Sequence, residues 1–445
     1  MVSGIPLLLL ILSSILLIIA LTAKFKLHPF LALVIACFYL GFTVQMPLPT
    51  ILTAIESGFS GLMAAIGLIV IFGSVIGIYL ERSGGALRIA QAISNLFGQK
   101  RTLPALSLIG AVVSIPVFCD SGFILLSGLS DKLSTLSKES KASLSLALAS
   151  GLYTTHTLIP PTPGPIAAAG NLGASDHLGT MILLGLAISI PVLFTTQFFA
   201  RRLGKGIKTE AISVSETSQE DNTALPSLWK ALLPLLLPIL LIAAATTGKF
   251  LGYLPYWLSF LGTPVIAIFL GALLAMFLLK PKESGETPQW FKDAIYVAGP
   301  ILIITAAGGA FGGVLKATLL ATDIADWIGE GNSSDIGMLV LVFVIAAVLK
   351  TAQGSSTSAM VITSSLLAPM LPVFGWDSAI EFALAVAAIG GGAMMVSHYN
   401  DSYFWVVSQF SGMDAKATGK SFSVLTVVQG ITVLSITILL WIVLT

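Results

Sequence analysis

The stretch QGSSTS (residues 353–358) interrupts an apolar run in the second half of this 445-residue chain, and FCDSG (residues 118–122) does the same in the first half. A second interruption follows in each half: THTLIPPTPGP (residues 155–165) and SHYNDS (residues 397–402). Lipid cannot satisfy backbone donors and acceptors, so irregular backbone at membrane depth persists only inside protein or beside water. Paired breaks at corresponding positions of two halves are typical of the binding site of a secondary transporter.

The composition indicates a membrane protein. The chain is 56% hydrophobic and only 10% charged, whereas a soluble domain has about 25% charged residues. Apolar runs at residues 5–23, 181–200 and 422–444 approach the roughly 20 residues that a spanning helix needs. The formal charge of +1 gives no footprint for nucleic acid. The two cysteines, Cys37 and Cys119, lie far apart in apolar runs, so we expect no disulfide framework, no metal site and no cofactor.

One long hydrophilic stretch, residues 201–227, predicts a cytoplasmic linker between two membrane repeats, residues 1–200 and residues 228–445. Three short matches support the repeat. IFGSV (residues 71–75) resembles AFGGV (310–314), AVV (111–113) resembles AVL (347–349), and TH (155–156) resembles SH (397–398). The matches keep their order and a separation of about 240 residues, as expected of an internal repeat.

Basic residues set the expected orientation, because cytoplasmic loops carry an excess of Lys and Arg. The apolar run at residues 103–129 leads to Lys132, Lys138 and Lys141. These lysines stay inside only if the run is a re-entrant hairpin with its tip near Asp120. The second half reverses the pattern. We therefore expect an all-α polytopic membrane protein built as an inverted repeat, each half with about five spanning helices, one re-entrant hairpin and one interrupted helix.

The charge pattern does not account for three lysines. Lys249 and Lys316 fit the charge pattern less well, and Lys350, close to the second hairpin, has no assigned role.

Two acidic residues in the breaks are the expected proton-coupling residues. An ionised carboxylate at mid-bilayer costs roughly 2.5–3.5 kcal/mol on insertion scales, so Asp120 must face a polar cavity, bind a cation or take up a proton. The alternative is a carboxylate near the interface that caps a hairpin helix. Asp401 can accept a proton or position His398 and Asn400. Its alternative role is that of a helix N-cap, for which Asp is a favoured residue.

Polar groups beside the breaks form the expected substrate site. His156 and His398 occupy matching repeat positions, where each can donate a hydrogen bond or titrate near neutral pH. A single buried His is usually structural, and twin histidines beside two breaks leave a structural and a functional role equally open. We add to them the neighbouring amide of Asn400.

Hydroxyl groups complete this site. Ser355, Ser356 and Thr357 offer hydroxyls and free backbone N–H groups at a helix N-terminus, which attracts anions. The alternative is small-residue packing between helices. Ser121 supplies a hydroxyl at the first hairpin tip, and Thr162 lies in a proline-rich break that no helix can continue.

Together these stretches resemble the gluconate:proton symporter (gluconate permease, GntP) family, within the ion-transporter superfamily, over essentially the whole chain. The resemblance rests on FCDSGF (residues 118–123), THTLIPPTPGP (155–165), GSST (354–357) and SHYND (397–401), followed by Phe404 and Trp405. It implies proton-coupled uptake of a sugar acid or small hydroxy-carboxylate across the bacterial inner membrane. It also implies a homodimer in the lipid bilayer, with a fixed scaffold and a moving transport domain.

The chain departs from the gluconate-type pattern at two positions. That pattern commonly has His where Thr162 stands and Glu where Asp120 stands. Relatives in the family carry fructuronate, idonate, glycerate or D-serine, and the sequence does not choose among them. A symporter for D-serine or another small amino acid and a sodium-coupled carboxylate transporter therefore stay open as alternatives.

Two other classes of membrane protein, an enzyme and a channel, fit the sequence less well than a transporter. A membrane enzyme would need a nucleophile and a base, for which Ser355 and His398 can be imagined, but no G-x-S-x-G elbow is present. A channel would need a continuous polar pathway with rings of charge or carbonyl groups. Two opposed hairpins instead favour alternating access.

Overall fold

The computed structural model describes residues 1–445 except residues 99–100, 138, 210–224, 281–285, 321 and 324–334. The described residues form helices and the turns that join them, with no strand among them. Eight helices in this part of the chain are long and apolar enough to cross a membrane, and four further apolar helices are shorter. The chain is thus an all-α polytopic membrane protein, as its composition predicts.

The first half combines two apolar helices, one very long helix and a series of shorter ones. Its third helix has 35 residues, more than a perpendicular span requires. The elements are α1 (Gly4–Ile19), η1 (Ala20–Lys24), α2 (Pro29–Thr43), α3 (Leu48–Arg82), α4 (Gly85–Phe97), α5 (Thr102–Val113), α6 (Cys119–Leu136), α7 (Lys141–Leu158), α8 (Pro163–Asn171), η2 (Ser175–His177) and α9 (Leu178–Gly204).

The second half also contains long helices and short helical pieces. The elements are α10 (Leu228–Phe250), α11 (Tyr256–Leu261), α12 (Pro264–Leu278), α13 (Glu286–Lys316), α15 (Asp335–Gln353), α16 (Ser356–Leu367), η3 (Ala368–Met370), α17 (Leu371–Phe374), α18 (Ala379–Met394), α19 (Ser402–Ser411) and α20 (Ala415–Leu444).

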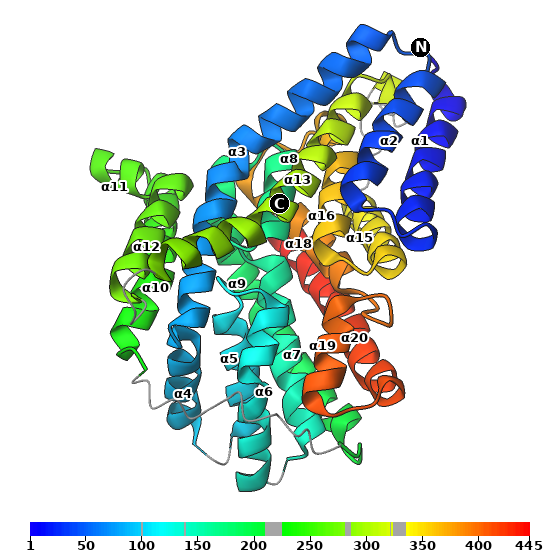
Figure 1. Ribbon diagram of the computed structural model, residues 1–445. Coiled ribbons are helices and arrows are strands. Elements are labelled where there is room, and N and C mark those ends of the chain that lie inside the picture. Colours follow the sequence, from blue (N-terminus) through cyan, green and yellow to red (C-terminus); the bar gives the residue numbers. More distant parts are fainter. Residues whose placement is uncertain (99–100, 138, 210–224, 281–285, 321, 324–334) are drawn as a thin grey trace.

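The long helices α3 and α13 cross at glycine contacts. A Cβ atom on Gly58 would lie 2.3 Å from the carbonyl oxygen of Gly309, and one on Gly313 would lie 2.3 Å from that of Ala54. Only glycine permits so close an approach of two backbones. α2 packs against α13, and α12 packs against α3. Figure 1 shows the pairs α1–α2 and α10–α12 on opposite sides of this crossing.

Helices end and restart at all four polar interruptions. The causes are local. Proline has no N–H to donate and disfavours the helical conformation of the residue before it, which ends α7 ahead of Pro160 and Pro161. Gly354 adopts a positive φ of 75° between α15 and α16. The four helices that begin after these breaks are α6, α8, α16 and α19.

These four helices bring the two halves together. α6 packs against α19, and α8 packs against α16. Two buried hydroxyls also bond between the halves: Tyr403 donates to the carbonyl oxygen of Ala149 at 2.9 Å, and Tyr153 donates to that of Ala393 at 3.2 Å. Each of these contacts joins residues from both halves. The polar breaks at which the four helices begin therefore lie in the same part of the molecule.

The expected linker lies only partly within the described residues. α9 continues to Gly204, so its last turn includes the beginning of residues 201–227, and α10 starts at Leu228. Residues 210–224 and Lys138 lie outside the described part of the chain.

Candidate functional site

Side chains of the second break, residues 397–402 before α19, cap the C-terminal end of α15. The Nε2 atom of His398 lies 2.9 Å from the carbonyl oxygen of Thr351. The Nδ2 atom of Asn400 donates to the carbonyl oxygens of Thr351 at 2.8 Å and Ala352 at 3.1 Å. The last carbonyl groups of a helix have no hydrogen-bond donors within it. The side chains of His398 and Asn400 serve as donors to these carbonyl groups. His398 and Asn400 therefore hold the end of α15, at the turn that leads into α16, while the buried Oδ1 atom of Asn400 has no hydrogen-bond partner among the described residues.

The tip of the second hairpin is pressed against the same break. A Cβ atom on Gly354 would lie 2.1 Å from the carbonyl oxygen of Asn400. The next residue, Ser355, is the N-cap of α16, and its Oγ atom accepts the N–H of Ser358 at 3.2 Å. Ser356 and Thr357 form the first turn of α16, where N–H groups have no acceptor within the helix. The helix start that the sequence predicts is thus present, and its binding of an anion stays a prediction.

A buried ion pair joins hairpin and break, and the sequence did not predict it. The Nζ atom of Lys350 lies 2.6 Å from Oδ2 of Asp401, with side-chain exposures of 1% and 5%. The same ammonium donates to the carbonyl oxygen of Gly354 at 3.2 Å. Asp401 is also the N-cap of α19 and accepts the N–H of Tyr403 at 3.1 Å. The unassigned lysine in an apolar run was the available signal, but its partner lies 51 residues away.

Asp120 lies in the first turn of α6 and takes part in none of the four ion pairs formed by the described residues. Its carboxylate accepts hydrogen bonds from the Oγ atom of Ser402 at 3.5 Å and from the Sγ atom of Cys119 at 3.9 Å. It interacts electrostatically with Asp401 and Lys350. Two carboxylates and one ammonium therefore share this region, and Asp120 is the carboxylate without a cationic partner in contact.

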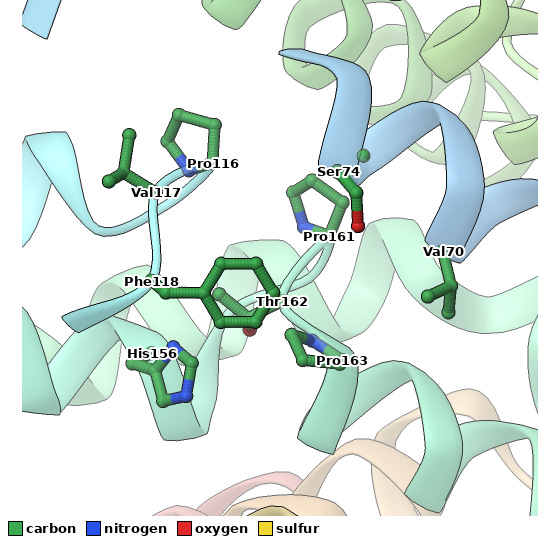
Figure 2. A pocket seen from close by; sticks show the side chains of 10 residues that line it. Val70, Ser74, Pro116, Val117, Phe118, His156, Pro161, Thr162 and Pro163 are labelled. Carbon is green, nitrogen blue, oxygen red and sulfur yellow. The ribbon is translucent and has the colours of Figure 1, made fainter. Parts of the chain in front are cut away.

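A small cavity lies between α3, the loop before α6 and the first break, which is residues 155–165 between α7 and α8. It has about 10 Å³ of room for water centres, close to the minimum for one water molecule. Figure 2 shows Phe118, His156 and Thr162 gathered on one side and Val70 and Ser74 of α3 on the other. The imidazole of His156 lies 6.0 Å from the Phe118 ring, and its buried Nδ1 atom has no hydrogen-bond partner among the described residues.

The two remaining predicted residues are bonded within the protein. The hydroxyl of Thr162 donates to the carbonyl oxygen of Ile159 at 2.5 Å. The hydroxyl of Ser121 interacts with the Glu81 carboxylate of α3. Both lie beside the first hairpin tip, but the structure gives them local partners.

Two tyrosines, which the sequence analysis did not predict, form the packed base of this region. The rings of Tyr153 and Tyr403 are 5.3 Å apart, and the Nζ atom of Lys350 lies 5.9 Å from the Tyr153 ring centroid. Gln353, at the end of α15, has both amide atoms buried without a hydrogen-bond partner among the described residues. Free polar atoms on Gln353, Asn400 and His156 are thus available beside the hairpin tips.

The model of the GntP family permeases matches residues 5–443. The chain belongs to the GntP family of permeases. It is 31% identical over 439 residues to a gluconate permease of Pseudomonas aeruginosa, covering 96% of each chain. It is 30% identical to the D-serine transporter DsdX of Escherichia coli (strain K12), covering 97% of each. The crystal structure of the Alcanivorax borkumensis YdaH transporter is similar in fold, with a TM-score of 0.66 at 17% identity over 93% of this chain and 98% of that one.

Family membership decides between the classes that the sequence left open. The protein is a multi-pass membrane permease and not an enzyme. The geometry agrees, since Ser355 caps α16 and His398 contacts the end of α15. No hydrogen bond of the kind that a nucleophile and its base would need joins these two side chains among the described residues.

Proposed function

We propose that this GntP permease takes up a small hydroxy-carboxylate, such as a sugar acid of the gluconate type, together with protons. The substrate would bind between the tips of two re-entrant hairpins, α5–α6 and α15–α16. The observation that carries this proposal is the meeting of four helix starts beside one carboxylate that has no ion pair among the described residues. Helix N-termini bind anionic groups through free N–H groups and the helix dipole.

The architecture supports alternating access by an inverted repeat. α3 and α13 cross through glycines, α5–α6 and α15–α16 each break at a tip, and α7–α8 and α18–α19 each break in the middle. We assign α1–α3 and α10–α13 to a scaffold and the broken helices with α9 and α20 to a transport domain. In a homodimer, the scaffold would stay fixed while the transport domain moves.

Proton coupling would follow from the charges at the site. Asp401 already has Lys350 as its partner, whereas ionised Asp120 would repel a carboxylate substrate. A proton on Asp120 removes that repulsion, so proton and anion would each favour binding of the other. We therefore assign the coupling proton to Asp120 first and to Asp401 second. Entry of an uncoupled anion against 100 mV would be opposed by about 2.3 kcal/mol.

A small amino acid such as D-serine is the second candidate. Asp120 has no cationic partner among the described residues, so it could hold the ammonium group of a zwitterion. The D-serine transporter relative is nearly as similar as the gluconate permease.

Uptake into proteoliposomes tests the function. A pH gradient, acidic outside, should drive accumulation of labelled gluconate or a shorter hydroxy-acid, and the unlabelled substrate should compete. D-Serine, glycerate and idonate are tested as competitors in the same assay. Competition by D-serine alone would support the amino-acid alternative. Accumulation that requires sodium and ignores the pH gradient would contradict the coupling to protons.

A further inference from the structure

Lys350 is a buried cation with no place in the transport scheme above. Its ammonium is 1% exposed and contacts two oxygens, Oδ2 of Asp401 and the carbonyl oxygen of Gly354. Asp401 belongs to the second break, and Gly354 to the tip of the second hairpin. The ammonium therefore bridges two segments that are otherwise joined by His398 and Asn400.

The surroundings of this ammonium suit a cation of any kind. Lys350 lies in the last turn of α15, and Ser397 follows closely after the end of α18. Helix C-termini carry negative partial charge. In secondary transporters, unwound carbonyl groups and half-helix C-termini are the groups that coordinate sodium ions. Here the same groups, with one carboxylate, surround the Nζ atom.

The carboxylate is held in place for this contact. The hydroxyl of Ser397 donates to Oδ2 of Asp401, and the N–H of Tyr403 donates to Oδ1 at 3.1 Å. Both oxygens thus accept hydrogen bonds from the protein.

We propose that Lys350 supplies, as part of the chain, the cation that joins the second hairpin to the second break. Without its side chain, the oxygens of Asp401, Gly354 and Ser397 form a site for a sodium ion. Lysine has a compact ammonium charge on a flexible stem, which suits it to this role. The permease would in this way be independent of sodium at a position where a free cation would otherwise bind.

Other charged and titratable groups also face this pair, and a test must separate them from it. Asp120 and Cys119 on α6 interact with it electrostatically, as do Tyr153 and His156 on α7. These groups stay unchanged in every variant below, so that a response to sodium reports on the Lys350 position.

Thermal unfolding of the purified permease in detergent tests the proposal. The Tm is measured in NaCl, KCl and choline chloride at equal ionic strength. We expect the wild type to show the same Tm in all three salts. Lys350→Ala should show a lower Tm in choline chloride and a rise that saturates with increasing NaCl. The double variant Lys350→Ala/Asp401→Ala should lose this rise, and the exposed-lysine control Lys316→Ala should behave like the wild type.

Three results would overturn the proposal. A sodium response of the wild type would show that Lys350 does not fill the site. A Lys350→Ala variant whose Tm is the same in all salts would show that no site opens. The third result would be that the double variant can be purified as folded protein, whereas Lys350→Ala cannot, even in NaCl. Sodium would then be unable to replace the ammonium. The Tm measurement does not depend on the proposed function, so either can fail without the other.

Discussion

At the residue scale, Gly354 links the hairpin tip to the break. Its φ of 75° belongs to the left-handed region, and a Cβ atom would lie 2.1 Å from the carbonyl oxygen of Asn400. Gly354→Ala should therefore cost more than the roughly 1–2 kcal/mol of the left-handed conformation alone.

Gly375→Ala is the matched control for this clash. Gly375 also has a positive φ, 67°, but no neighbouring atom lies within 4 Å of its Cβ position. Thermal unfolding should show a clearly larger fall in Tm for Gly354→Ala than for Gly375→Ala. Equal falls would mean that the packing of the tip against Asn400 contributes nothing.

The start of α16 is expected to bind the substrate carboxylate. Ser356→Ala and Thr357→Val should each weaken substrate affinity about tenfold or more, because a hydrogen bond to a charged group is worth roughly 1.5–3 kcal/mol. The apparent Km for uptake measures the effect, and the Tm should change little. Ser435→Ala, which removes an exposed hydroxyl of α20, is the control. A normal Km in both site variants would place the carboxylate elsewhere.

The sequence located the polar residues of the breaks but did not reveal the contacts that these residues make. Hydroxyls and histidines in an apolar chain identified the breaks, because polar groups at membrane depth are costly unless protein or water satisfies them. It could not show that His398 and Asn400 cap α15, or that Lys350 pairs with Asp401, since both depend on which helix ends meet in space. Lys350 stood out only as an unexplained charge.

At the element scale, the helix breaks were predictable and the contacts between helices were not. Proline, glycine and clustered hydroxyls locate the ends of α5, α7, α15 and α18 from local chemistry alone. The packing of α6 against α19 and of α8 against α16 joins segments from different halves. No local pattern in the sequence specifies such pairings.

The re-entrant topology is testable by labelling. In a background with Cys37→Ala and Cys119→Ala, Lys132→Cys should react with a membrane-impermeant thiol reagent only from the cytoplasmic side. Lys316→Cys should react only from outside. Both lysines are exposed in the structure. Labelling of Lys132→Cys from outside would make α5–α6 a full span and remove the basis for an inverted repeat.

At the scale of the whole molecule, the transport domain must move relative to α3 and α13. A Cβ atom on Gly73 of α3 would lie 3.5 Å from the Cβ atom of Pro161 in the first break, a separation that allows a disulfide. In the cysteine-free background, Gly73→Cys/Pro161→Cys should therefore cross-link on oxidation and stop transport. Reduction should restore the transport that the double variant shows before oxidation. Normal uptake by the cross-linked protein would contradict a moving transport domain.

Proton coupling through Asp120 is tested most directly by comparing two modes of transport in proteoliposomes. Asp120→Asn carries no charge that a proton could neutralise. We expect it to exchange internal for external substrate, yet to show neither uphill uptake in a pH gradient nor substrate-driven proton entry. Asp401→Asn is measured beside it. Substrate-driven proton entry by Asp120→Asn at the wild-type rate would contradict the assignment of the coupling proton to this carboxylate.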